Sequence, residues 1–434
     1  MDVEIIRLGE AEPARLRKIL QRANHRIFSE EILGHVRGIL EDVRRRGDEA
    51  ILEATRQWDR VELTVDRLPV GRTEIHQAYE QVDDGVRKAI EAAIERTRRF
   101  NELLRPRAMW LEEIEEGMVI GAKVTPVESV GVYVPAGKGA FPSTCVTIVT
   151  PAVMAGVQEI AIVLPPRPDG SADPAVLVAA DMLGVHRVFR CNGVAGIAGL
   201  AFGTATLPRV QKVVGPGNPY VVAAQLAVQS YGVDMSVLLG PTECVVLADG
   251  DADPKRVALD LLNEAEHGED SAAILVTIDE GIAREVRHHL EAFLQKLPSP
   301  RREYAMAALS EYGGLLVARD MEEAVAFINL YAPEHLQIAT RNPWEIVQKI
   351  RNAGEVLIGQ ETPFSAANYA IGVPAALPTG GAARYSSGVT ILSFLKLTSL
   401  ASLDPRGLER VRPVVERLGH YENFPAHVMA VTQR

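Results

Sequence analysis

The chain has 434 residues, 47% of them hydrophobic and 24% charged, which is the balance of an ordinary soluble globular protein with roughly two to four domains. Its formal net charge of −11 argues against a nucleic-acid partner, because phosphate binding needs a basic surface, although a locally positive anion pocket stays open. No apolar run reaches the roughly 18–20 residues that span a bilayer, and the N-terminus lacks the basic-then-apolar pattern of a signal peptide.

Residues 1–110 are expected to be mostly helical, because segments such as Val36–Gln57 and Val86–Leu104 mix charged and apolar residues at helical spacing. Beyond them, short β-branched runs alternate with helical patterns, which indicates βα units and mainly parallel sheets. Strands are expected at Val130–Val134, Glu159–Leu164, Arg187–Arg190, Lys212–Val214, Val245–Ala248, Ala272–Thr277, Leu315–Ala318, Leu336–Ala339 and Glu355–Ile358. Helices between them are expected at Pro174–Leu183, Tyr220–Gln229, 280–296, 321–330 and 343–352. The pattern predicts two α/β domains, with short helices after about residue 388.

Three cysteines, Cys145, Cys191 and Cys244, lie far apart in apolar stretches and form no CxxC pair. We therefore expect buried thiols in a reducing cytosol, and hence a cytoplasmic protein.

Glycine-rich turns follow two of the expected strands, at Gly131–Ala140 and at Gly215–Asn218. Backbone N–H groups at such turns can cradle a phosphate, but neither turn is the GxGxxG dinucleotide fingerprint, and each alone is more typical of an ordinary tight turn. A third turn, Gly240–Glu243, is equally ambiguous.

A candidate metal site begins on the segment Arg256–His267, whose apolar positions predict a helix that ends at Gly268. Glu264 and His267 are i and i+3 on one face of this helix, a spacing that can hold one metal ion. Alternatively, His267 only stabilises the C-terminal end of the helix through its interaction with the helix dipole.

A carboxylate beside an imidazole, Glu334-His335, opens one of the later strands. Such a pair can relay protons near neutral pH, because histidine titrates at about 6.5 and a partly buried glutamate can be tuned toward it. A solvated loop is the alternative for this segment. Asn368 and His427 are further possible ligands, although each alone is more typical of a structural residue.

Several segments together resemble the histidinol dehydrogenase family, in order and spacing from roughly residue 30 to the end. They are GVYVPAGKGAFPST (131–144), AGLAFGT (198–204), VGPGN (214–218), GPTE (240–243), LLNEAEHGEDS (261–271), YAPEHL (331–336), LPT (377–379) and AH…AVTQR (426–434). The resemblance implies an α/β fold with two incomplete Rossmann-like domains, mainly parallel sheets and small helical terminal segments. It also implies a zinc ion, and NAD as the acceptor in two hydride transfers that take a primary alcohol to an aldehyde and then to an acid.

The expected domain boundaries are 1–25 for an N-terminal helical segment, 26–130 with 244–388 for the first Rossmann-like domain, 131–243 for the NAD-binding domain and 389–434 for a helical segment. Members of the family are homodimers that exchange this last segment. His427 and Glu422 would therefore reach the active site of the partner subunit.

The resemblance also assigns roles to single residues. His335 would act as general base on the substrate hydroxyl, and Glu334 would activate water for attack on the aldehyde. The other matches are His267 and His427 to zinc ligands, Tyr133 and Asn218 to residues that touch NAD, and Thr242 to a serine of the substrate pocket.

The metal ligands depart from the family pattern in two places. This chain has Glu264 where members that act on histidinol have glutamine, and Asn368 where they have aspartate. The two exchanges cancel in charge, and an amide oxygen can still bind a borderline cation. We therefore expect zinc binding to survive with the carboxylate on the other side of the metal; the alternative is a weakened or empty site.

Further departures concern the substrate and the cofactor. Phe364 replaces a glutamate that helps to bind histidinol, Ala375 replaces a histidine, and Ala195 replaces a glutamine near NAD. Each polar group of histidinol that is left without a partner in the pocket would cost roughly 1–3 kcal/mol of binding free energy. Nearby Arg384 has a planar fork that suits an anionic group, although a structural arginine is the alternative.

These departures favour a paralogue that oxidises a small anionic alcohol, with 3-sulfopropanediol, oxidised to sulfolactate, as the concrete candidate. Oxidation of L-histidinol in histidine biosynthesis is the second interpretation, and Glu422 and His427 are still present to support it. A catalytically silent metal- or nucleotide-binding relative is a third, against which the intact Glu334-His335 pair argues.

Overall fold

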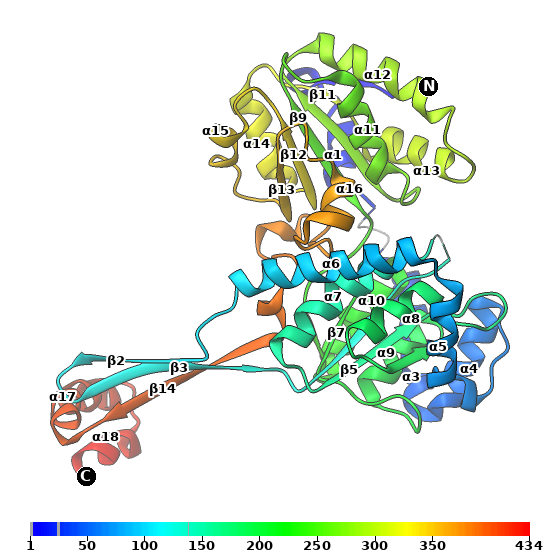
Figure 1. Cartoon of the computed structure of the whole chain (residues 1–434). Helices are drawn as coiled ribbons and strands as arrows, with labels where there is room; N and C mark the ends of the chain where they lie inside the picture. Colours follow the sequence, from blue (N-terminus) through cyan, green and yellow to red (C-terminus); the bar gives the residue numbers. More distant parts are fainter. Residues whose placement is uncertain (1–2, 24–26, 138) are drawn as a thin grey trace.

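The computed structural model describes residues 3–23, 27–137 and 139–434, and it places two α/β domains one above the other with a slender arm at the side (Figure 1). The expected boundary at residues 25 and 26 lies outside the described residues, as does Lys138 of the first glycine-rich turn.

One domain, at the bottom of Figure 1, is built on a five-stranded parallel sheet with strand order β6-β5-β4-β7-β8. Its strands are β4 (Ser129–Tyr133), β5 (Glu159–Leu164), β6 (Arg187–Arg190), β7 (Lys212–Val214) and β8 (Asp234–Met235). One face packs on α5 (Arg72–Gln81), α6 (Asp84–Leu103), α7 (Pro142–Ala155) and α8 (Pro174–Met182). The other packs on α3 (Glu30–Arg46), α4 (Asp48–Ala54), α9 (Gly193–Phe202) and α10 (Pro219–Val228).

The upper domain has a six-stranded parallel sheet with strand order β1-β11-β10-β9-β12-β13. Its strands are β1 (Ile5–Arg7), β9 (Glu243–Ala248), β10 (Ala272–Thr277), β11 (Gly314–Val317), β12 (His335–Ala339) and β13 (Glu355–Ile358). One face packs on α11 (Pro254–Ala265), α12 (Glu280–Leu294), α13 (Arg301–Ala307) and α16 (Phe364–Ala366). The other packs on α1 (Pro13–Gln21), α14 (Met321–Tyr331) and α15 (Pro343–Val347).

The predicted α/β class and mainly parallel sheets are confirmed. Every residue of the central strands β9 and β10 is buried, because helices cover both faces of the sheet. Short helical turns complete the domains: η1 (Leu8–Glu10), η2 (Thr55–Asp59), η3 (Val65–Arg67), η4 (Gln229–Tyr231), η5 (Ala308–Tyr312), η6 (Ala367–Ile371), η7 (Ala382–Arg384) and η8 (Ile391–Phe394). No helix within the described ranges is long and apolar enough to cross a membrane.

The arm is an antiparallel sheet of order β14-β3-β2 that carries the C-terminal helices away from both domains (Figure 1). It contains β2 (Met109–Glu115), β3 (Met118–Pro126), β14 (Leu395–Leu403), α17 (Pro405–Tyr421) and α18 (Pro425–Thr432). The expectation of short helices throughout 389–434 is therefore wrong for residues 395–403, which pair with β3.

The packing of the early helices differs from the expected grouping of residues 26–130 with 244–388. Apolar residues of α3 and α4 pack against β5 and α9, and those of α5 and α6 against α7 and α8. The helices of residues 30–103 therefore belong to the lower domain, because their apolar faces meet its sheet and not the upper one.

The two domains meet where η6 approaches α6. Gly372, which ends η6 with φ of +90°, lies so close to α6 that a Cβ atom would stand 2.4 Å from the carbonyl carbon of Arg96. This position therefore requires glycine for both its backbone angle and its space.

We predict that Gly372→Ala lowers the free energy of unfolding by about 3 kcal/mol, from strain at positive φ plus overpacking against α6. Gly232→Ala is the matched control, because Gly232 has φ of +81° but nothing within 4 Å of the added Cβ, so about 1 kcal/mol is expected. Urea denaturation of the two variants checks this, and equal losses would contradict the close approach.

Candidate active site

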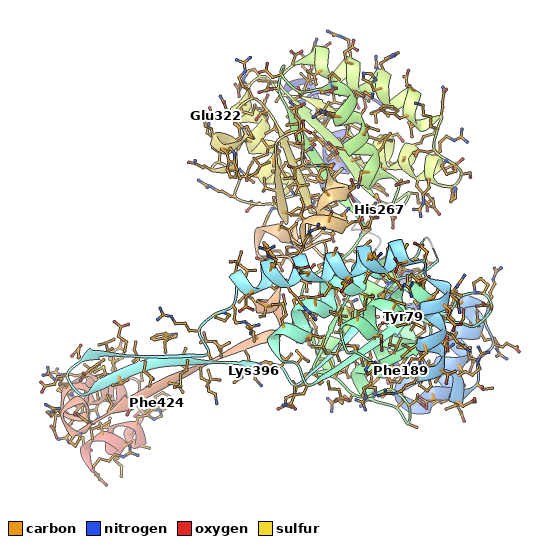
Figure 2. The ribbon with its side chains drawn as sticks, in the orientation of Figure 1. Tyr79, Phe189, His267, Glu322, Lys396 and Phe424 are labelled. Atoms are coloured by element: carbon orange, nitrogen blue, oxygen red, sulfur yellow. The ribbon has the colours of Figure 1, made fainter. Side chains whose placement is uncertain are left out.

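A cavity of about 260 Å³ lies between the two domains, where the carboxyl ends of β4 and β7 face the amino ends of β9 and β12. All three glycine-containing turns contribute to its wall, through Pro135 and Ala136, through Pro216–Asn218 and through Gly240–Thr242. Figure 2 shows His267 at this junction. In the lower sheet, β4 and β7 flank the point where the strand order reverses, which is where open α/β sheets bind ligands.

The C-terminal end of α11 brings Glu264 and His267 into the cavity, where Asn368 of η6 meets them. Glu264 is only 1% exposed, and its Oε1 accepts hydrogen bonds from the side-chain amides of Asn263 (2.7 Å) and Asn368 (2.8 Å). Its Oε2 lies 3.5 Å from His267 Nδ1. Burial alone would raise the pKa of Glu264, but His267 and His335 outweigh it and lower that pKa.

Glu334 and His335 enter the same cavity from the start of β12. His335 Nε2 lies 3.6 Å from Glu334 Oε1, and its Nδ1 lies 2.5 Å from Oε1 of Glu355. Parallel pairing places His335 directly beside Glu355, the first residue of β13, so the sheet register itself makes this contact. The other Glu334 oxygen, Oε2, accepts the backbone N–H of Glu243 at 2.9 Å.

The pKa values of Glu334 and His335 are shifted because both side chains are buried and lie among carboxylates. Burial raises the pKa of Glu334 to about 8, although His335 opposes the rise. Burial disfavours a charged His335, but Glu334, Glu264 and Glu355 outweigh it and raise the pKa of the imidazole to about 10. Both groups therefore titrate away from their ordinary ranges, as is typical of functional sites.

On the side of the lower domain, Tyr133 and Asn218 line the cavity. Asn218 caps α10, since its side chain accepts the N–H groups of Tyr220 and Val221. Ala195, in contrast, is fully buried in the first turn of α9 and does not line the cavity.

Of the expected substrate residues, Thr242 and Ala375 line the cavity. Phe364 is fully buried behind it, with its ring 5.6 Å from that of His335. Arg384 is exposed, does not line the cavity and donates to the carbonyl of Leu330, which favours the alternative of a structural arginine.

His427 and Glu422 lie exposed on the arm, away from the cavity of their own chain. Figure 2 shows neighbouring Phe424 at this far end, and its ring stands 5.1 Å from that of His427. The described residues accordingly hold no cluster of three or more His, Cys, Asp or Glu side chains that could bind a metal ion. Glu264, His267 and Asn368 together offer carboxylate, imidazole and amide donors, which are types of ligand that zinc accepts.

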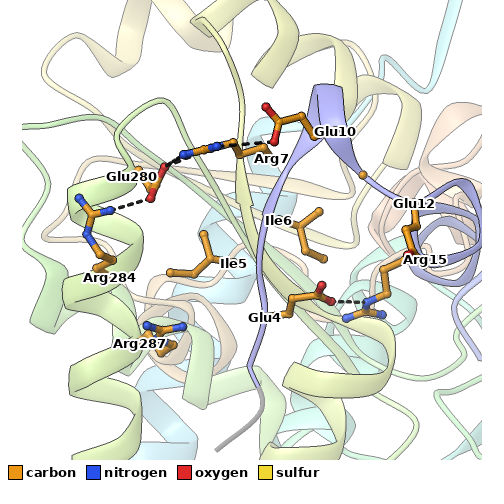
Figure 3. A pocket seen from close by; sticks show the side chains of 11 residues that line it. Glu4, Ile5, Ile6, Arg7, Glu10, Glu12, Arg15, Glu280, Arg284 and Arg287 are labelled. Carbon is orange, nitrogen blue, oxygen red and sulfur yellow. Dashed lines mark hydrogen bonds and ion pairs between the residues drawn. The ribbon is translucent and has the colours of Figure 1, made fainter.

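A larger hollow, of about 590 Å³, lies beside β1 at the edge of the upper sheet (Figure 3). Its charges largely pair with one another, including Arg7 with Glu280 at 2.8 Å and Arg15 with Glu4 at 3.4 Å. It therefore lacks the convergent chemistry of the inter-domain cavity.

Two glutamates that contact the Glu334-His335 pair without lining the cavity themselves, Glu243 and Glu355, are not predicted from the sequence. Each is the first residue of a strand that flanks β12. That shared position was the available signal, because the starts of neighbouring parallel strands meet at one sheet edge.

Comparisons with known proteins show the family and agree with the fold. A family model described as histidinol dehydrogenase matches residues 22–434. The chain is 42% identical over 430 residues to a histidinol dehydrogenase of Synechocystis sp., covering 99% of this chain and 98% of that one. It is 39% identical to a histidinol dehydrogenase homolog of Colwellia psychrerythraea, covering 99% and 96%. The crystal structure of histidinol dehydrogenase from Elizabethkingia anophelis matches with a TM-score of 0.92 at 33% identity, covering 100% and 97%.

We predict that Glu355→Gln lowers turnover about 10- to 100-fold, because the charged partner that orients His335 is lost. The pKa of His335 should fall below about 10, since a carboxylate that stabilises the protonated ring is gone. NADH formation and an NMR titration of the metal-free protein measure the two effects. Glu361→Gln, at a carboxylate that is 85% exposed, is the control, and unchanged turnover in Glu355→Gln would contradict the assignment.

Proposed function

The chain belongs to the histidinol dehydrogenase family of NAD-dependent oxidoreductases, and from that premise we propose that it oxidises a primary alcohol through the aldehyde to the carboxylic acid. The observation that carries the proposal is the buried Glu334-His335 pair. It lines the inter-domain cavity together with the candidate metal ligands and the candidate NAD residues. Bound NAD would supply the hydride acceptor, and bound zinc would polarise the substrate oxygen.

His335 suits the role of general base because its Nδ1 is held by Glu355, which leaves Nε2 to accept a proton in the cavity. Its pKa is raised to about 10 in the absence of a cation, so it would stay protonated near neutrality. A dication held by Glu264 and His267 would oppose that rise, because positive charge nearby disfavours the protonated ring.

The two oxidation steps divide the work between the two residues. In the first, His335 accepts the hydroxyl proton while the carbon loses hydride. Before the second step, His335 releases this proton to solvent. A bound dication would oppose the rise in the pKa of Glu334 and so favour its ionised form. In the second step, ionised Glu334 accepts at Oε1 a proton from water as the water oxygen bonds to the aldehyde carbon, and His335 then accepts a proton from the hydrate as hydride leaves. Overall, one alcohol, one water and two NAD give one carboxylate, two NADH and three protons.

Among the described residues, three of the four expected zinc ligands, Glu264, His267 and Asn368, line the cavity, and His427 is the candidate to supply the fourth from a second copy. We propose a homodimer in which the arm of each chain reaches the cavity of the other. Apolar side chains on the arm support this, because several are too exposed for a surface that stays in water: Leu397 (65%), Val414 (58%), Leu418 (55%) and Tyr421 (91%).

L-histidinol is the leading substrate, because relatives that cover nearly the whole chain carry that activity in their names. This reverses the order favoured by the sequence alone. A small anionic alcohol such as 3-sulfopropanediol stays the second candidate on one observation: Phe364 and Ala375 leave no carboxylate or imidazole at two positions in or behind the cavity wall. Arg384 adds no support, because it does not line the cavity.

We predict that the zinc-loaded enzyme forms two NADH for each L-histidinol and little with either enantiomer of 3-sulfopropanediol. His335→Asn is the control, which should retain NAD binding and form no NADH, because the general base is gone. Turnover of one sulfopropanediol enantiomer with silence on L-histidinol would establish the second candidate instead.

We further predict that Glu264→Gln lowers zinc affinity by on the order of 100-fold, because it removes the carboxylate from the ligand set. Asn368→Asp should bind zinc at least as tightly as the natural protein, and the double exchange should return near the natural affinity, since its ligand charge is the same. Competition with a chromophoric chelator measures these constants. Unchanged affinity in Glu264→Gln would show that Glu264 is not a ligand.

A further inference from the structure

A buried ion pair lies directly behind the catalytic turn, between Arg22 and Glu243. The Arg22 side chain is 4% exposed and that of Glu243 is 3% exposed, and Arg22 Nε lies 3.0 Å from Glu243 Oε1. Arg22 follows the last residue of α1 and itself has φ of +56°, so the chain adopts an unfavourable backbone angle to place this side chain.

Arg22 also holds the turn that leads from α14 into Glu334. Its guanidinium stacks 3.7 Å above the ring of Tyr331, and its Nη2 donates to the carbonyls of Tyr331 and of Ala332. Ala332 has φ of +53°, which is strained for a residue with a side chain. Such a conformation persists only where the surroundings fix it, and Arg22 supplies part of that fixation.

Glu243 connects the pair to the reacting carboxylate. Its side chain accepts the backbone N–H of Gly380 at 2.6 Å, and its own backbone N–H donates to Glu334 Oε2 at 2.9 Å. The side chain of Glu243 therefore sets the position of the start of β9, and the N–H group at that start fixes one oxygen of Glu334. The other oxygen, Oε1, is left on the side of His335.

We propose that the Arg22–Glu243 pair is a positioning device for Glu334, which holds its Oε1 where a water molecule is activated for attack on the aldehyde. This inference rests on the proposed function and adds two residues to it. Neither residue lines the cavity, so neither is a catalytic residue.

The device should act mainly on the second oxidation step. His335, which serves both steps, has its own anchors, because Glu355 holds its Nδ1 and its backbone lies in register between Cys244 and Glu355. Glu334 is held less firmly. Its Oε2 accepts the backbone N–H of Glu243, and its Oε1 lies 3.6 Å from Nε2 of His335. A small displacement at β9 should therefore misplace Glu334 more than His335.

The test separates the two steps by supplying the alcohol and the aldehyde independently to Arg22→Lys, Glu243→Gln and Glu243→Asp. Each variant retains part of the buried hydrogen bonding, so that at least one should fold. We expect oxidation of the aldehyde to fall about 100-fold, the scale of a 1 Å misplacement, with alcohol oxidation within about threefold and the KM for NAD unchanged. Aldehyde should accumulate when the alcohol is supplied.

Arg190→Lys and Glu74→Gln are the matched controls, because Arg190 has an equally buried side chain that pairs with Glu74 in the lower domain. They should lose stability without changing the ratio of the two rates. Equal losses in both steps for the Arg22 and Glu243 variants would overturn the positioning role and leave the proposed function standing. If the protein without substitutions forms no NADH from the alcohol or from the aldehyde, the proposed function is wrong, and the inference falls with it.

Discussion

The site depends on holding four glutamates around one imidazole in a place that water hardly reaches. Glu243, Glu264, Glu334 and Glu355 have side chains that are 9% exposed or less, and three of them lie within 4.0 Å of a His335 nitrogen. Buried like charges are costly unless they are compensated. Arg22 pairs with Glu243, and His335 and His267 lie beside the other three.

The sheet topology explains how these groups come together from distant parts of the sequence. In the upper sheet, β9, β12 and β13 are neighbours, so Glu243, His335 and Glu355 at their starts lie side by side. The lower sheet presents its opposite, carboxyl edge to the same cavity through Tyr133 and Gly217. The Glu334-His335 pair and the glycine-containing turns of residues 135–136 and 216–218 thus belong to separate domains. Gly372 lets η6 pack closely on α6, and Asn368 of η6 lines the same cavity.

Much of this could be predicted from the sequence, and the failures have physical causes. The strands were predictable because helices cover both faces of each sheet, which leaves continuous apolar runs such as β10. The arm was missed because β2 and β14, the two strands that pair with β3, are exposed along all or most of their length and so lack that signal. Glu264, His267 and Glu334-His335 were found from local spacing, whereas Glu355 and Arg22 act through contacts between segments 20 and more than 200 residues apart, which local patterns do not show. For Arg384 the sequence left two roles open, because a fork suited to anions also suits a backbone carbonyl such as that of Leu330.

The central claim is that one cavity carries out both oxidation steps, with water activated at Glu334. The most direct test is turnover of the active alcohol in water labelled with oxygen-18, with NADH counted and the product analysed by mass spectrometry. We expect two NADH per alcohol and one labelled oxygen in each carboxylate, and we expect Glu334→Gln to stop after one NADH and release aldehyde. One NADH per alcohol in the natural protein, or an acid without label, would contradict the claim.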